Sequence, residues 1–279
     1  MLLPAWLGLA GCSAIKLGYN NLDALAYWWI DGYVDLTDEQ APRVREDIAR
    51  LHQWHRAHEL PKIGAVLARL EQMLPGDIAP AQACTLVAPV RERLRASADR
   101  AEPAAVTLAL DLGPEQLRHL ERRYRKNNAQ YRKEWLEPAP AELRDKRLQL
   151  LLERGEMVYG RLDEPQRAAL RAQLEQSGYD APRVLAERLR RQQDALQTLG
   201  KLAGQPVALA EARALVRGYV DRLEHSPDPA WRQYQEAQIQ EGCRLFAALH
   251  NSTAPAQREA GVRRLRAYQR DLRELAARQ

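Results

Sequence analysis

The sequence has little of what sheet proteins and common enzyme classes use. Phe occurs once among 279 residues and β-branched residues are sparse, so a sheet protein is not expected. No glycine-rich phosphate loop, no Gly-x-Ser-x-Gly motif and no His-Glu-x-x-His motif is present. We therefore predict a protein that is not an enzyme, with no catalytic residue, no cofactor and no metal.

Lys is also scarce, and the basic residues are nearly all Arg. The formal net charge at pH 7 is +5, and charges of both signs are interspersed along the chain. Interspersed charges favour solvated helix faces, with an anionic partner as the alternative. Because no basic block is interleaved with aromatic residues, no nucleic-acid partner is expected.

The abundant residues are Leu, Ala, Arg, Gln and Glu, which favour helices. Pro and Gly lie between the periodic runs, and the connections are short, so antiparallel neighbours are expected. We predict an all-α fold of about ten helices in a multi-helix antiparallel array, forming a single domain over residues 21–279. Residues 103–113 are the one apolar stretch expected to be non-helical. The predicted helices cover residues 21–34, 38–74 (kinked at Pro61), 80–99, 114–136, 141–161, 164–177, 182–202, 207–224, 229–249 and 256–277.

The first residues, MLLPAWLGLAGCS, resemble a bacterial lipobox that ends in Leu9-Ala10-Gly11-Cys12. The resemblance implies a diacylglycerol on Cys12, a signal-peptide remnant over 1–11 and a lipidated tether over 12–20. The alternative is a short buried segment with an incidental Cys. No Lys or Arg precedes Cys12, whereas signal peptides begin with a positive region and run about 15–30 residues, so a start upstream of Met1 would fit better.

The residues after Cys12 are Ser13 and Ala14, and the absence of Asp there resembles the outer-membrane sorting pattern. We therefore expect an outer-membrane lipoprotein whose body lies on the periplasmic face, with the membrane as a partner through the lipid. Because the periplasm is oxidising, Cys84 and Cys243 could form a disulfide. Two buried free thiols are the equally weighted alternative.

A Leu-x-x-x-Gln motif recurs at three expected helix starts, in DLTDEQ, DLGPEQ and RLDEPQ. The spacing predicts capping boxes, in which the Gln at the third helical position reaches back to the cap residue. LTDEQ also resembles the Leu-Thr-x-x-Gln motif of the Spy/CpxP family of periplasmic helical chaperones, whose chains are about half as long. That resemblance implies a concave cradle that binds unfolded clients. The predicted cap pairs are Thr37 with Gln40, Gly113 with Gln116, and Asp163 with Gln166.

Two segments near the N-terminus concentrate aromatic and histidine residues. Together they resemble the N-terminal region of an uncharacterised family of Gram-negative helical lipoproteins with a domain of unknown function, which implies location and fold but no reaction. We expect Trp54, His55 or Glu59 to contact Asp31 or Tyr33 of the preceding helix. The candidate cluster is Tyr19, Asn20, Trp28, Asp31, Tyr33, Trp54, His55, Arg56 and Glu59.

A metal site on this segment is the weaker alternative. His52, His55 and Glu59 share a helix face, but no further His or Asp cluster completes a ligand set. Trp28 and Trp29 are expected either in the core or as anchors near the membrane.

These observations predict a lipid-anchored periplasmic protein that acts by binding, or as a structural or interaction protein of the envelope. The first alternative is a Spy-like chaperone or client-binding cradle, with an unfolded client as its partner. The second is an envelope hydrolase that uses His55 and Glu59.

Overall fold

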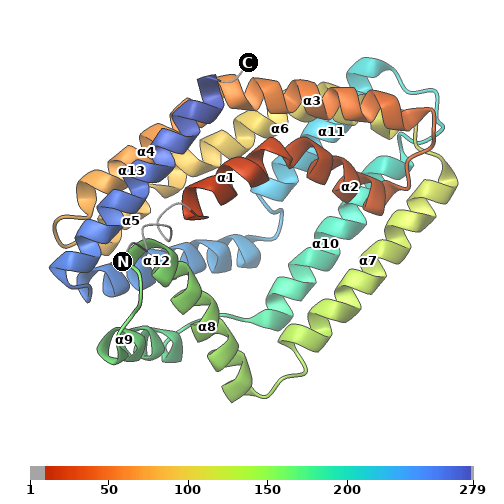
Figure 1. The fold of residues 1–279 in the computed structure, drawn as a ribbon. Helices are drawn as coiled ribbons and strands as arrows, with labels where there is room; N and C mark the ends of the chain where they lie inside the picture. Colours follow the sequence, from red (N-terminus) through yellow and green to blue (C-terminus); the bar gives the residue numbers. More distant parts are fainter. Residues whose placement is uncertain (1–9, 278–279) are drawn as a thin grey trace, which may run out of the picture.

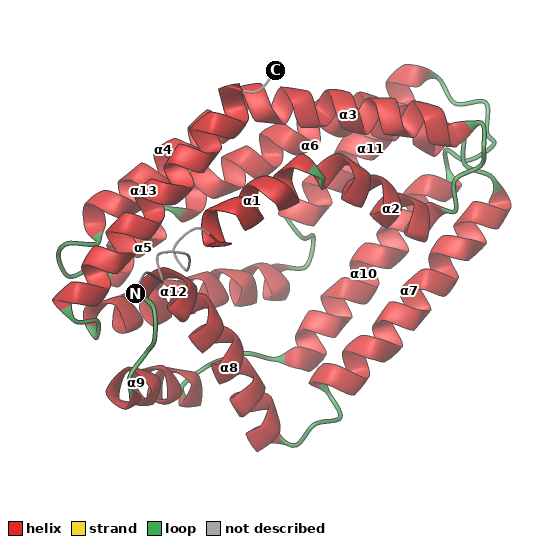
Figure 2. Cartoon of the chain, in the orientation of Figure 1, coloured by secondary structure: helices red, strands yellow, loops and turns green. Residues whose placement is uncertain are grey.

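In the computed structural model, residues 10–277 are described, and every regular element among them is a helix (Figures 1 and 2). The all-α prediction is confirmed. The helices are α1 (Ala10–Asn20), α2 (Leu22–Val34), α3 (Gln40–His58), α4 (Leu60–Met73), α5 (Pro80–Cys84), α6 (Val87–Leu110), α7 (Pro114–Trp135), α8 (Pro140–Tyr159), α9 (Glu164–Glu175), α10 (Ala181–Gly200), α11 (Leu209–Glu224), α12 (Pro229–Asn251) and α13 (Pro255–Ala277).

The described part of the chain has thirteen helices rather than about ten, because two expected helices are divided and residues 10–20 are also helical. The long helix expected over 38–74 is interrupted at Glu59, and Pro61 lies in the first turn of α4. Pro is tolerated there, because the first N–H groups of a helix lack helical acceptors in any case. The segment expected to be a tether is helical from Ala10, and Lys16 pairs with Asp271 of α13.

The prediction that residues 103–113 are non-helical is wrong, because α6 continues through Pro103 to Leu110. Pro103 removes one helical hydrogen bond, which costs about 3 kcal/mol in a helix interior. Burial offsets this cost, since Val106 and Ala109 are buried against Ala212 and Val216 of α11. Local sequence therefore favoured a break, and packing against α11 overrides it.

The helices form two halves with the same internal arrangement. In the first half, α2 packs against α7 and α3 against α6; in the second half, α8 packs against α13 and α9 against α12. The remaining helices pack on the opposite half. In the first half α4 contacts α13 and α5 contacts α12, and in the second half α10 contacts α7 and α11 contacts α6. The contact pattern thus has an approximate twofold symmetry that relates one half of the chain to the other.

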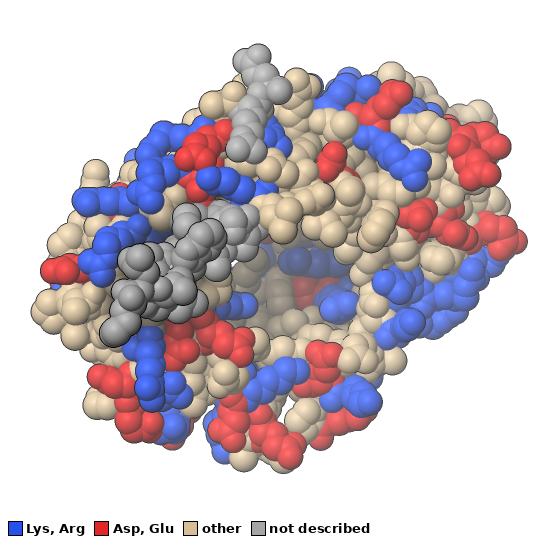
Figure 3. Space-filling model, in the orientation of Figure 1, with Lys and Arg blue, Asp and Glu red and all other residues tan. Residues whose placement is uncertain are grey.

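The two halves together surround a hollow. In Figure 1, α1 and α2 cross the near side above it, and α8, α10 and α12 border it below and to the right. The space-filling view shows the hollow at the centre of this face, with side chains of both charge signs on its walls (Figure 3). The interspersed charges of the sequence thus also line a concave surface.

The largest apolar core lies in the second half and extends onto α4 and α5. Leu170, Leu174, Leu249 and Leu265 are buried there. A smaller cluster joins α6 to α11 and to the end of α10. The second half therefore contains the larger cluster of buried apolar side chains.

Candidate functional site

The three predicted capping glutamines all accept a hydrogen bond from the backbone of their cap residue. At the start of α3, the Thr37 N–H donates to Gln40 Oε1 over 3.2 Å, and the Gln40 N–H donates to Thr37 Oγ1 over 3.3 Å. Asp163 and Gln166 exchange the same two bonds, at 2.9 and 3.0 Å. Gly113 has no side-chain acceptor, so only its N–H donates to Gln116, at 2.9 Å.

Gln40 and Gln116 also face one another across the first half. Each amide donates to the other's oxygen, with Nε2–Oε1 distances of 3.3 and 2.7 Å. Each also donates across to the other helix start, Gln40 to the Asp111 carbonyl at 2.8 Å and Gln116 to the Asp35 carbonyl at 3.0 Å. Both side chains are buried, so their amides join two helix starts inside the protein.

The second half repeats this arrangement with Gln166 and Gln257. Their Nε2–Oε1 distances are 2.6 and 3.1 Å, and Gln257 accepts from the Ala254 N–H at 2.9 Å. Gln166 donates to the Ser252 carbonyl at 3.1 Å, and Gln257 donates to the Arg161 carbonyl at 3.0 Å. Every polar contact of the first pair thus has its counterpart in the second.

The fourth glutamine, Gln257, is absent from the sequence prediction. It follows Ser252-Thr253-Ala254-Pro255, so Thr253 stands where the other three copies have Leu. Thr253 is nevertheless buried, as are Leu112 and Leu162 at the matching positions. The signal that could have found this copy is a Pro at the first helical position followed by Gln at the third.

The aromatic and histidine cluster fixes α1 against α3. The Tyr19 hydroxyl lies 2.9 Å from His55 Nδ1, and its ring lies 4.8 Å from the ring of His52. Arg56 donates to Asn20 at 3.1 Å and to the Leu275 carbonyl at 3.2 Å. Burial raises the pKa of Tyr19 to about 12 and lowers the pKa of His55 below its ordinary value, so both groups are neutral near pH 7.

Glu59 is fully buried at the break between α3 and α4. It accepts from Lys62 at 2.9 Å and from Arg93 of α6 at 3.2 Å. These contacts occupy the carboxylate, and His55 is occupied by Tyr19. Within the described residues, no group of three His, Cys, Asp or Glu side chains is placed to hold a metal ion.

The expected contact of this cluster with Asp31 or Tyr33 is wrong. Asp31 instead accepts from the Leu36 N–H at 3.0 Å and so supports the turn after α2. Tyr33 contacts α7, where its hydroxyl accepts from Asn127 at 2.6 Å. Trp54 stacks on His58 of its own helix, with 5.7 Å between the ring centroids. The partner of His55 comes from α1 because α1 is a helix packed on α13, and Tyr19 near its C-terminal end reaches α3.

Trp28 and Trp29 are not core residues. Their relative exposures are 72% and 63%, and Leu17, Leu22 and Leu25 are also exposed. These five residues, which we call the α1–α2 apolar face, lie on consecutive helices directly after Cys12. Among the described residues, no helix is long and apolar enough to cross a membrane.

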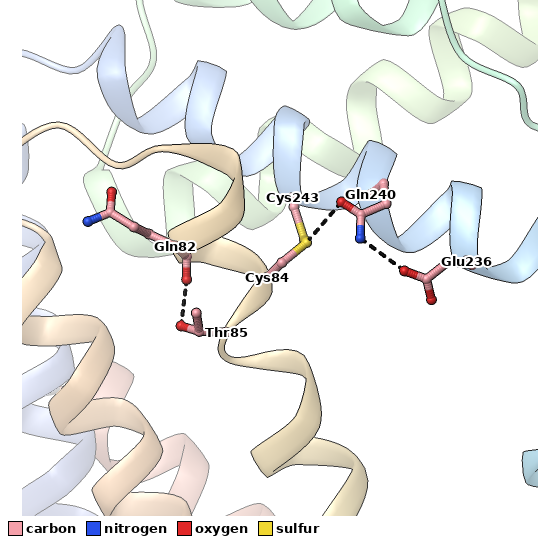
Figure 4. Close-up of a disulfide and its surroundings, with 6 residues drawn as sticks. All are labelled: Gln82, Cys84, Thr85, Glu236, Gln240 and Cys243. Carbon is pink, nitrogen blue, oxygen red and sulfur yellow. Dashed lines mark hydrogen bonds between the residues drawn. A yellow bond between two sulfur atoms is a disulfide. The ribbon is translucent and has the colours of Figure 1, made fainter.

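Cys84 and Cys243 are joined by a disulfide, with 5.4 Å between their Cα atoms. The bridge connects α5 to α12, and Gln240 lies beside it on α12 (Figure 4). The backbone of Cys12 lies in the first turns of α1, but its side chain is outside the described part of the structure, as is the apolar run over 1–9.

The model of a family of unknown function (DUF6279) matches residues 32–215, about two thirds of the chain. The match begins in α2 and ends in α11, and it includes Gln40, Gln116 and Gln166. Neither the curated proteins nor the solved structures gave a match.

Proposed function

Because the chain belongs to this family of unknown function, we propose its role from its geometry: it is an outer-membrane lipoprotein that binds partners in the periplasm. The observation that carries the proposal is the α1–α2 apolar face. Five exposed Leu and Trp side chains directly follow the lipobox-like sequence at Cys12. Trp and Leu side chains are favoured at a membrane interface, where a lipid anchor would hold this face against the bilayer.

The disulfide supports the proposed compartment. A bridge between Cys84 and Cys243 persists in oxidising surroundings such as the periplasm and is rare in the cytosol. The central hollow supports a binding role, because it offers a concave surface with charges of both signs (Figure 3). His55 and Glu59 have partners within the protein, which favours a structural role for both over hydrolysis.

Metabolic labelling with a palmitate analogue tests the anchor. Wild-type protein should be labelled and should fractionate with the outer membrane, whereas Cys12→Ala should be unlabelled and released into the periplasm. Trp28→Ser/Trp29→Ser should still be labelled, because it leaves the lipobox unchanged. Equal labelling of wild type and Cys12→Ala would rule out lipidation at Cys12.

A client-binding cradle is the second candidate, and the internal repeat favours it. Each half carries two Gln-capped helix starts, and chains of the Spy/CpxP family are about as long as one half. The assay is suppression of aggregation of a reduced, denatured client at equimolar ratio, followed by light scattering. Suppression by the oxidised protein supports a cradle; undiminished aggregation at a tenfold excess of the protein removes it.

A further inference from the structure

An apolar groove of about 330 Å³ lies between α2, α3 and α6 in the first half. Its walls are Ile30 of α2, Ile48 and Leu51 of α3, and Ala104, Ala105 and Leu108 of α6. Volume and lining fall in the range of small-molecule sites, which are mostly apolar with a few polar groups that fix orientation. No contact described above uses this groove.

The internal repeat shows why the groove exists. When α6 and α12 are placed in register on Gln116 and Gln257, the buried residues coincide: Val106 matches Ala247, and Ala109 matches His250. In the same register, Ala104 and Ala105 stand where the second half has Leu245 and Phe246, which pack on its core. The groove is therefore the space that two large side chains fill in the other half.

Charge at the groove selects the head group of an occupant. The charged residues that line it are Asp47, Arg50 and Arg100, which leave a net positive charge. Arg50 is paired with Asp47 at 2.5 Å and with Glu46 at 3.4 Å. Arg100 is exposed and has no hydrogen bond or ion pair within the described residues, so it is available to an anion.

We propose that this groove binds one acyl chain of a single-chain amphiphile with an anionic head, carboxylate or phosphate, that pairs with Arg100. The chain takes the place that Leu245 and Phe246 occupy in the second half. This site differs from the proposed membrane face, and it stands whether or not Cys12 is lipidated.

The test uses the full chain with Cys12→Ala, so that no attached acyl chain competes. Decanoate, dodecanoate and tetradecanoate compete with the fluorescent probe dansyl-undecanoate. The affinity of the competing fatty acid should increase about fourfold for each added methylene until the groove is full. Dodecyl phosphate and dodecanoate should both displace the probe. The ratio of their dissociation constants shows whether the site prefers a phosphate or a carboxylate head group. Displacement that does not depend on chain length would overturn the proposal.

Filling the groove gives the decisive variant. Ala104→Leu/Ala105→Phe installs the side chains of the second half and should abolish probe binding, whereas Ala210→Leu, a matched change at an exposed position of α11, should bind as wild type. Circular dichroism and urea unfolding report whether the double variant folds. If the double variant does not fold, Ala105→Phe alone replaces it in the binding assay. Ala105 is exposed, so a Phe there should cover the entrance of the groove without disturbing the core. Wild-type affinity in a folded filled variant would overturn the site.

The head group is tested separately. Dodecanol should bind up to about fivefold more weakly than dodecanoate, and Arg100→Gln should remove that difference, because exposed ion pairs contribute little. Equal affinity of dodecanol and dodecanoate for the wild type would overturn the anionic head. An apolar peptide that displaces the probe as well as dodecanoate does would show that the groove takes protein segments instead.

Discussion

The two halves of the molecule share one arrangement of helices but fill it differently. In the second half, Leu245 and Phe246 pack on the core, while Ala104 and Ala105 at the equivalent positions of the first half leave a groove open. The same backbone plan thus yields a filled scaffold on one side and an accessible apolar site on the other. The proposed acyl-chain groove is therefore specific to the first half, whereas the central hollow is bordered by both halves.

Two equivalent contacts that join one half of the molecule to the other also differ in kind. The disulfide joins α12 to α5, and in register Cys243 corresponds to Glu102 of α6. Glu102 joins α6 to α11 by accepting from Arg213 at 2.8 Å and from Arg217 at 2.9 Å. One equivalent contact is covalent, and the other consists of ion pairs with partly exposed Arg side chains.

Removing the disulfide should have the largest effect on stability. Cys84→Ala/Cys243→Ala releases a long loop between residues 159 apart in sequence, which should lower the free energy of unfolding by about 2–5 kcal/mol. Urea unfolding of the oxidised protein gives the value. Glu102→Gln, at the equivalent ionic link, should cost about 1 kcal/mol or less because both Arg partners are partly exposed. Equal losses in the two variants would contradict the comparison.

The next largest difference between the halves is expected when a large apolar side chain is truncated to Ala. Leu249→Ala in the filled half should lower the free energy of unfolding by about 2–5 kcal/mol, because it leaves a cavity. Its counterpart Leu108→Ala should cost clearly less, since Leu108 already borders an open groove. Paired urea titrations measure both; a Leu108→Ala loss as large as that of Leu249→Ala would show that the groove is closed in solution.

The glutamine pairs should behave alike in both halves. Gln166→Ala leaves the Asp163 N–H and the Ser252 carbonyl without these partners, so it should cost about 1–3 kcal/mol. Gln40→Ala should cost a similar amount. Because the amides contact each other, Gln166→Ala/Gln257→Ala should differ from the sum of the single changes by about 0.5–3 kcal/mol. Strict additivity would mean that the reciprocal contact contributes nothing.

The smallest expected effect is on pH dependence. Burial lowers the pKa of His250 below the ordinary 6.5, and the Tyr159 hydroxyl and the Gly76 carbonyl hold its neutral ring. The unfolded chain then binds more protons below about pH 6.5, so the free energy of unfolding should decrease as the pH falls from 7.5 to 5.5.

Urea unfolding at both pH values measures this decrease, and His250→Gln should reduce it. Part of the decrease in the free energy of unfolding should remain in His250→Gln, because burial lowers the pKa values of His52 and His55 as well. A free energy of unfolding that does not change with pH would contradict the expected role of the buried histidines.

Sequence predicted the fold class and most helix boundaries because their signals are local. Each capping box lies within four residues, and Pro114, Pro140 and Pro255 stand at the first helical position. Local signals failed at Pro103, where packing against α11 keeps the helix intact. They also missed the break at Thr85 and Leu86 within the single helix expected over 80–99, because no strong breaker marks these two residues.

The candidate sites were less predictable because they depend on contacts between distant residues. Gln40 and Gln116 could each be identified as caps, but nothing in either segment indicates that the two amides meet. The groove depends on Ala104 and Ala105 being smaller than Leu245 and Phe246. Such a difference in size becomes visible only when the register between α6 and α12 is known.

The glutamine pair has a consequence for how such a chain can arise. A primary amide has one donor group and one acceptor group, so it is its own complement. Two identical hairpins can therefore meet through it symmetrically, without either one changing to fit the other. A carboxylate at the same position could accept but not donate, and two of them would repel. Duplication of a single hairpin would thus begin with a finished interface. A second duplication, of the joined pair of hairpins, would give the two halves, which keep the same glutamine joint and differ at Ala104 and Leu245.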